Sequence, residues 1–104
     1  MAVIAEDSTR CLIAEFTVKP GNEARVAVMM SVLTVDVRNE PGCLEFSPFT
    51  REGEPRHWVV IERYRDLAAF EAHISAPYGK VFNDELVTLI ENAAGSTLTF
   101  LSPV

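Results

Sequence analysis

The chain has 104 residues, of which 48% are hydrophobic and 23% charged. This length fits one domain, and the composition is that of a globular protein with a packed core rather than of a disordered chain. Nine Lys and Arg against fifteen Asp and Glu give a net charge of −6, which repels phosphate groups. We therefore expect no nucleic acid and no anionic membrane among its partners, and a single domain over 1–104 with 1–9 as an N-terminal tail.

Targeting and membrane-spanning signals are not found in the sequence. The opening MAVIAEDSTR lacks a basic region followed by a long apolar one, and no run of about eighteen apolar residues occurs. These observations predict a cytoplasmic protein. Cys11 and Cys43 stand singly, without the spacing of a disulfide framework or a metal site, and are predicted to be free thiols.

The first half of the chain predicts a strand, a helix and a second strand. Residues 11–19 alternate apolar and polar side chains, and the apolar face consists of Leu12, Ala14, Phe16 and Val18. Apolar residues then recur at steps of three and four over 23–38, which is typical of an amphipathic helix, and Asn22 is its expected N-cap. A second strand is predicted over 43–49.

The second half predicts a hairpin, two helical stretches and a last strand. The polar stretch 51–56 is expected to be a hairpin loop, followed by a third strand over 57–65. Asp66 is placed to cap a short helix. A further helix is predicted from about 79 to 92, and a fourth strand over 97–101.

This element order is the split βαβ arrangement of ferredoxin-like α+β folds, with a four-stranded antiparallel sheet in spatial order 4-1-3-2 and helices on one face. The opposite face carries Ile13, Val59 and Ile61. Leaving each of these side chains in water costs about 1.5 to 3 kcal/mol. We therefore expect a homodimer that packs the two uncovered sheet faces together.

Four segments resemble the antibiotic biosynthesis monooxygenase domain family, and they span nearly the whole chain in the family's order. They are AEFTVKPGNE (14–23), NEPGCLEF (39–46), VVIERYRDLAAFEAHISAP (59–77) and the terminal strand near 97–101. The resemblance implies a dimeric α+β barrel. Members of the family include cofactor-free oxygenases of quinols and anthrones, haem-degrading enzymes, isomerases of small signalling sugars and proteins of no known activity.

The haem-degrading members differ from this chain at three informative positions. They carry an Asn in the first strand, a Trp at the end of the third and an iron-binding His on the late helix, where this chain has Phe16, Tyr64 and Asn83. Phe16 offers no hydrogen bond, and Asn83 is a poor iron ligand. Haem is therefore not expected.

The third strand and the following helix carry the candidate catalytic residues Glu62, Tyr64 and His73. A carboxylate inside an apolar run is costly to desolvate unless it is paired, and such an acid can become neutral near pH 7 and transfer protons. His73 lies one step from the apolar stripe of its helix and is a natural proton acceptor for an acidic phenol. The alternatives are a Glu62 paired with an Arg and a His73 that is only structural.

Aromatic residues on several elements are the predicted substrate-binding set: Phe16, Phe46, Trp58, Tyr78 and Phe82, with Phe49 as a further flat wall. The alternative is that they are ordinary core aromatics. His57 borders the hairpin loop and is expected to be solvated. No nucleotide, metalloprotease or serine-hydrolase motif occurs, and the two His with Glu62 make only a weak metal hypothesis, so no metal site is predicted.

The favoured function is a cofactor-independent monooxygenase that combines a small electron-rich aromatic, such as a quinol or anthrone, with molecular oxygen. In this hypothesis His73 takes a proton from the substrate, Glu62 and Tyr64 orient the substrate oxygen, and no cofactor is needed. Two alternatives stay open. One is a non-enzymatic small-ligand-binding or stress-response protein, and the other is an isomerase of a small carbonyl compound.

Overall fold

The computed structural model of the protein describes residues 8–104, so most of the tail predicted over 1–9 lies outside the described residues. The elements in chain order are β1 (Arg10–Thr17), α1 (Glu23–Arg38), β2 (Cys43–Arg51), β3 (Glu54–Tyr64), α2 (Leu67–Ile74), α3 (Pro77–Leu86) and β4 (Thr97–Leu101). The strands form one antiparallel sheet in the order β2-β3-β1-β4. This is the predicted order 4-1-3-2 read from the other edge, and the ferredoxin-like α+β fold is confirmed.

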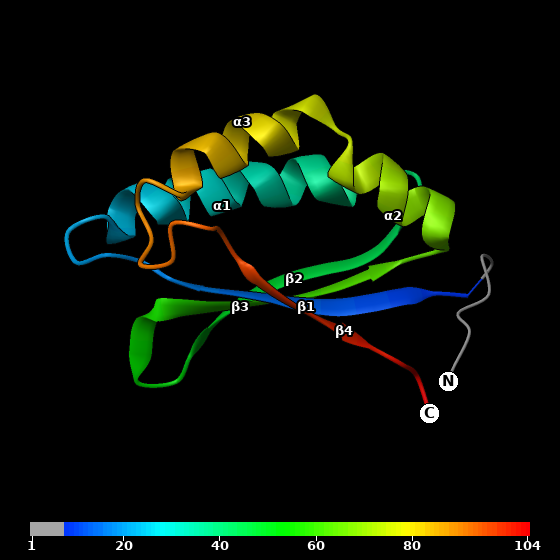
Figure 1. Ribbon diagram of the computed structural model, residues 1–104, viewed down its shortest axis with the longest axis horizontal. Helices are drawn as coiled ribbons and strands as arrows, with labels where there is room; N and C mark the ends of the chain where they lie inside the picture. The colour runs from blue at the N-terminus through cyan, green and yellow to red at the C-terminus, as the bar shows by residue number, and fades with distance from the viewer. Residues whose placement is uncertain (1–7) are drawn as a thin grey trace.

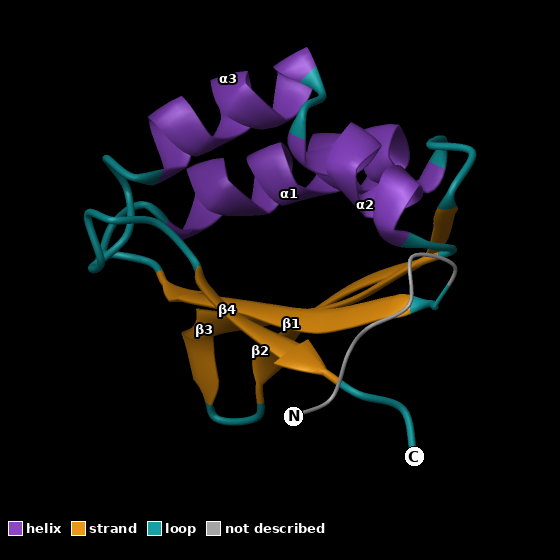
Figure 2. Ribbon diagram, turned by 45° about the vertical axis from the view of Figure 1, so that its right-hand side comes forward, coloured by secondary structure: helices purple, strands orange, loops and turns teal. Residues whose placement is uncertain are grey.

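The molecule has two layers. Figure 1 shows α1, α2 and α3 together on one face of the sheet, and Figure 2 shows the same separation after a turn of 45°. Within residues 8–104, no helix covers the opposite face. Any site enclosed between sheet and helices must therefore draw its walls from both layers.

The core fills the space between these layers. The predicted apolar face of β1 is buried, and α1 contributes Val26, Met29, Met30 and Val37 to the same cluster. Val28, Val32 and Val35 lie on the solvent side of α1 and are more than half exposed. Because β-branched residues weaken intrinsic helix propensity, α1 depends on its buried face for its stability.

Two predicted boundaries were wrong, each because of a backbone interaction. β2 and β3 continue to Arg51 and Glu54, which pair with each other, so the loop predicted over 51–56 is much shorter. α3 ends at Leu86 rather than near 92, because the backbone N–H of Glu91 donates to the carbonyl of Thr17 at 2.9 Å and the chain there pairs with the end of β1. Asn22 is the N-cap residue of α1, as predicted, although its side chain makes no capping hydrogen bond.

The start of α2 is fixed against the turn between α1 and β2. The carboxylate of Asp66 accepts a hydrogen bond from the backbone N–H of Ala69 at 2.8 Å, as its predicted role as N-cap requires. The backbone N–H of Arg65 donates to the carbonyl of Gly42 at 2.8 Å. A Cβ on Gly42 would lie 2.2 Å from the Cβ of Ala69, so only glycine allows α2 to approach this closely.

The uncovered sheet face is mixed rather than uniformly apolar. Ile13 pairs with Ile61 at its centre, and both are partly exposed. His57, which was expected to be solvated, has a side chain only 18% exposed, because its ring lies 2.7 Å from the Thr17 hydroxyl and 3.0 Å from Glu15. This face therefore combines an apolar centre with a polar network on the same strands.

The structure bears on two further predictions, that Cys11 and Cys43 are free thiols and that the sequence has no membrane-spanning segment. Cys11 on β1 and Cys43 on β2 are free thiols, and β3 lies between their strands. Among residues 8–104, none of the helices has the length and apolar character needed to cross a membrane.

Candidate active site

A cavity of about 370 Å³ lies between the sheet and the helices. This volume is within the range of small-molecule pockets. Most of the lining is apolar, with Phe46 and Val60 from the sheet and Met30, Phe70 and Phe82 from the helices. Its polar or titratable side chains are Glu62, His73, Asn83 and Ser96, and none of the residues that line it is Lys or Arg.

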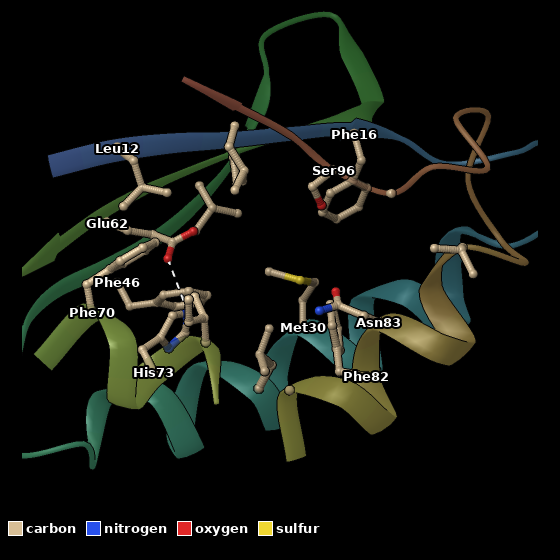
Figure 3. Close-up of a pocket in the computed structure, with 18 of the residues that line it drawn as sticks. Leu12, Phe16, Met30, Phe46, Glu62, Phe70, His73, Phe82, Asn83 and Ser96 are labelled. Atoms are coloured by element: carbon tan, nitrogen blue, oxygen red, sulfur yellow. Dashed lines mark ion pairs between the residues drawn. The ribbon is translucent and has the colours of Figure 1, made fainter. Parts of the chain in front are cut away.

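The polar side chains lie at two separate ends of the cavity. Figure 3 shows Glu62 and His73 facing each other at one end, where β3 passes over α2. Asn83 from α3 and Ser96 from the segment before β4 lie at the other end. Aromatic and aliphatic side chains fill the walls between them.

Glu62 is the one acidic residue in the cavity wall, and only 6% of it is exposed. The Tyr64 hydroxyl donates to Glu62 Oε1 at 2.6 Å, and His73 Nε2 lies 3.6 Å from the same oxygen. The second carboxylate oxygen points into the cavity (Figure 3). Burial raises the pKa of Glu62, and the Tyr64 hydrogen bond and His73 oppose that rise. This carboxyl group is therefore suited to accept or release a proton at the cavity wall.

His73 is held on three sides. Its Nδ1 lies 3.0 and 3.1 Å from the two carboxylate oxygens of Glu40, and its ring stacks on Tyr64 with centroids 4.6 Å apart. The Tyr78 hydroxyl donates to Glu40 Oε2. The result is a continuous polar chain from Tyr78 through Glu40 and His73 to Glu62 and Tyr64.

Five of the predicted site residues line the cavity, namely Phe16, Phe46, Glu62, His73 and Phe82. The other three are adjacent to it but do not line it. Tyr64 is fully buried behind Glu62, Trp58 stacks on Phe16 with centroids 6.1 Å apart, and Tyr78 directs its hydroxyl to Glu40.

Three further expectations concerned Phe49, His57 and Tyr64. Phe49 is 55% exposed and is no part of the cavity wall. His57 lies on the uncovered sheet face and His73 on the helix side, so the two do not meet in a metal site. Within residues 8–104, no group of three or more His, Cys, Asp and Glu is placed to hold a metal ion.

Burial and then the adjacent Glu62 raise the pKa of Tyr64 far above its ordinary value, so Tyr64 acts as a donor and not as a base.

Sequence reasoning missed Glu40, which makes the closest contact of the His73 ring nitrogens. The signal was present in the sequence, because Glu40 directly precedes the Pro41–Gly42 pair that ends α1. A glycine in that turn permits the close approach of another element, and α2 is the element that packs there. If this turn had been interpreted as the packing surface for α2, the helix that contains AFEAH, Glu40 would have been predicted to lie beside His73.

Comparison with known proteins identifies the family. The family model for antibiotic biosynthesis monooxygenase matches residues 9–85. The chain belongs to the antibiotic biosynthesis monooxygenase family. The match includes both Glu62 and His73, together with Glu40 and Tyr78.

Individual relatives are similar to the chain at low sequence identity. The chain is 28% identical over 83 residues to the probable quinol monooxygenase YgiN of Escherichia coli, covering 70% of this chain and 80% of that protein. It is 27% identical over 77 residues to an uncharacterised Synechocystis protein, covering 74% of this chain and about half (52%) of that longer relative. The structure of Rv0793 from Mycobacterium tuberculosis superimposes with a TM-score of 0.85 at 22% identity, covering 93% of this chain and 96% of that one.

The raised pKa of Glu62 predicts a pH-dependent stability that the Glu62→Gln variant lacks. Between the ordinary carboxyl pKa and the raised folded value, the native state binds more protons than the unfolded state, so the free energy of unfolding falls as pH rises. The glutamine side chain cannot ionise, but its carbonyl oxygen can still accept the hydrogen bond from the Tyr64 hydroxyl. The free energy of unfolding of the variant minus that of the wild type should therefore increase from about pH 4 upward.

Urea unfolding of both proteins from pH 4 to 8, at one protein concentration, measures this difference. Taking the difference cancels the titrating groups that do not contact Glu62, including Asp66 and Glu85, whose pKa values are lowered by their own partners. A difference that stays constant with pH would contradict the assignment of a raised pKa to Glu62.

Proposed function

We propose that the protein is a cofactor-independent monooxygenase that acts on a small, neutral, electron-rich aromatic of the quinol or anthrone type. The observation that carries the proposal is the pairing of Glu62 with His73, 3.6 Å apart, on the wall of a mostly apolar cavity. An acid–base pair beside an aromatic-lined space is suited to remove a proton from a phenol. The family and the likeness to YgiN support the reaction class.

The charge of the cavity supports a neutral substrate. No Lys or Arg side chain lines it, Glu62 is acidic, and the chain has a net charge of −6. A carboxylated or phosphorylated substrate would enter this space without a positive partner and would lose its hydration. A neutral ring with hydroxyl or carbonyl groups matches both the apolar walls and the two polar ends.

The reaction balances without a second reductant. For a quinol with one unsubstituted ring carbon, substrate plus O₂ gives the hydroxylated quinone plus water. His73 takes the phenolic proton, and the anion transfers one electron to O₂. The resulting radical pair combines to form a carbon–peroxide bond. His73 returns its proton to that peroxide, and O–O cleavage with loss of the ring proton releases water.

All the predicted site residues except Tyr78 have a part in this scheme. His73 is the proton acceptor, and Glu62 positions the substrate hydroxyl through the oxygen that faces the cavity. Tyr64 lies outside the cavity wall and fixes the Glu62 carboxylate by donating a hydrogen bond to it. Phe16, Phe46 and Phe82 supply flat walls, and Trp58 supports Phe16 by stacking on it. The dry environment makes the substrate anion a stronger reductant than it is in water.

The assembly that we propose is a cytoplasmic homodimer joined through the uncovered sheet face. Ile13, Val59 and Ile61 lie together on this face, beside the Glu15 and His57 pair, and an identical face can cover them in a symmetric interface. β4 supports the same conclusion, because Thr97, Thr99 and Leu101 pair with β1 residues of the uncovered face and are exposed in the single chain.

The function is tested by oxygen uptake with a panel of neutral quinols and anthrones. The wild-type protein should consume one O₂ per substrate, and His73→Gln should lower turnover by about 10²-fold or more while keeping an amide donor for Glu40. His57→Gln is the matched control, since it removes the other imidazole of the chain on the opposite face, and it should retain turnover. Tight binding without oxygen uptake would favour the non-enzymatic alternative, and turnover without oxygen uptake the isomerase.

The dimer is tested by Ile61→Asp, which places a charge at the centre of the proposed interface. Because folding and dimerisation are coupled in this proposal, the variant should be unfolded or aggregated. Phe49→Asp is an informative companion, because Phe49 is 55% exposed at the margin of the sheet. Phe49→Asp should weaken the dimer less than Ile61→Asp does. A folded monomer of the wild-type chain at micromolar concentration, measured by analytical ultracentrifugation, would contradict the interface.

A further inference from the structure

Glu40 lies outside the cavity wall, yet it contacts two of the aromatic side chains around it. Its carboxylate oxygens lie 3.0 and 3.1 Å from His73 Nδ1, and the Tyr78 hydroxyl donates to Oε2. Its side chain is 17% exposed and that of His73 is 19% exposed, so both are largely removed from water. Neither the proposed reaction nor the family assignment gives Glu40 a role.

The contact with Glu40 decides which nitrogen of His73 carries the proton. A neutral imidazole has one N–H, and an ionised carboxylate can only accept, so the N–H lies on Nδ1 and points to Glu40. The lone pair is then on Nε2, which faces Glu62 at 3.6 Å. This is the arrangement that a proton acceptor at the cavity wall requires.

We propose that Glu40 is a positioning residue for the acid–base pair, which holds His73 in the Nδ1–H tautomer and balances the charge of the imidazolium once Nε2 has taken a proton. Tyr78 holds Glu40 in place from α3. The catalytic consequence rests on the proposed monooxygenase function, whereas the tautomer does not.

The local sequence brings these groups together from three segments. Glu40 is in the turn before β2, His73 is in the last turn of α2, and Tyr78 follows the proline that opens α3. Gly42 sets the approach of α2 to that turn, as described above. The titratable groups that face His73 are therefore Glu40 from the turn, Glu62 and Tyr64 from β3, and Tyr78 from α3. Cys43 on β2 lies nearby, and burial raises the pKa of its thiol.

The tautomer can be measured without any substrate. Two-bond ¹⁵N–¹H correlation spectra of the imidazole rings distinguish Nδ1–H from Nε2–H, and the chain has only two histidines. We expect wild-type His73 in the Nδ1–H form, and a mixture of both forms in Glu40→Gln, since the glutamine amide can also donate. Glu15→Gln is the matched control, because Glu15 contacts His57 Nε2 at 3.0 Å; it should change His57 and leave His73 unchanged.

The kinetic consequence separates positioning from a structural role. Glu40→Gln should lower kcat by about 10- to 100-fold, as is usual for a group that orients a catalytic residue, with KM changed by no more than about 2-fold. The acidic limb of its pH–rate profile should move to lower pH, because the imidazolium has lost its counter-charge. Glu40→Asp should recover part of kcat, because it restores the charge. Tyr78→Phe should lower kcat by a smaller factor than Glu40→Gln does.

The proposal would be overturned by His73 in the Nε2–H form in the wild type, or by a Glu40→Gln variant with unchanged tautomer, kcat and pH profile. A fall in kcat that tracks only a lower melting temperature, with the pH profile in place, would also overturn it. If the wild type consumes no oxygen with any substrate, the proposed function fails. The spectra of wild type, Glu40→Gln and Glu15→Gln still decide the role of Glu40.

Discussion

The cost of burying the Glu62 carboxylate is the constraint on which the rest of the site depends. Glu62 lies on β3, a central strand of the sheet, with 6% of its surface exposed, where an unpaired charge would cost several kcal/mol. Tyr64, two residues along the same strand, offers a hydrogen bond at 2.6 Å, and His73 offers a partner that can carry positive charge. The arrangement is therefore a solution to a desolvation problem as well as the basis of the proposed chemistry.

His73 can serve this purpose only if α2 is held in one place. The Asp66 cap, the Arg65–Gly42 backbone hydrogen bond and the contact of Gly42 with Ala69 fix the helix against the turn that carries Glu40. The sheet then supplies the Glu62 carboxyl group, α2 supplies the His73 imidazole, and α1 and α3 supply apolar walls. Because no Lys or Arg lines the cavity, this arrangement favours binding of a neutral phenol over that of an anionic metabolite.

Much of this architecture could be predicted from local patterns. The alternation of Leu12, Ala14 and Phe16 defined the buried face of β1, and Asp66 was recognisable as a cap because an acidic residue directly preceded an apolar helical pattern. The end of α3 could not be predicted in this way, since it depends on pairing between residue 91 and Thr17, far apart in the sequence. Glu62 and His73 stood out because charged residues are unusual beside a core. Glu40 did not, because acidic residues in turns are common and only the approach of α2 and α3 gives this one its partners, His73 and Tyr78.

The central claim is that the Glu62–His73 pair removes a proton from an aromatic hydroxyl in the cavity. Its most direct test is the absorbance spectrum of a neutral naphthol-type quinol analogue bound to the protein without oxygen, at a pH at least one unit below the solution pKa of the analogue. We predict the band of the anion in the complex with the wild type, and that of the neutral phenol with His73→Gln. A neutral spectrum in the wild-type complex at full occupancy would contradict the account.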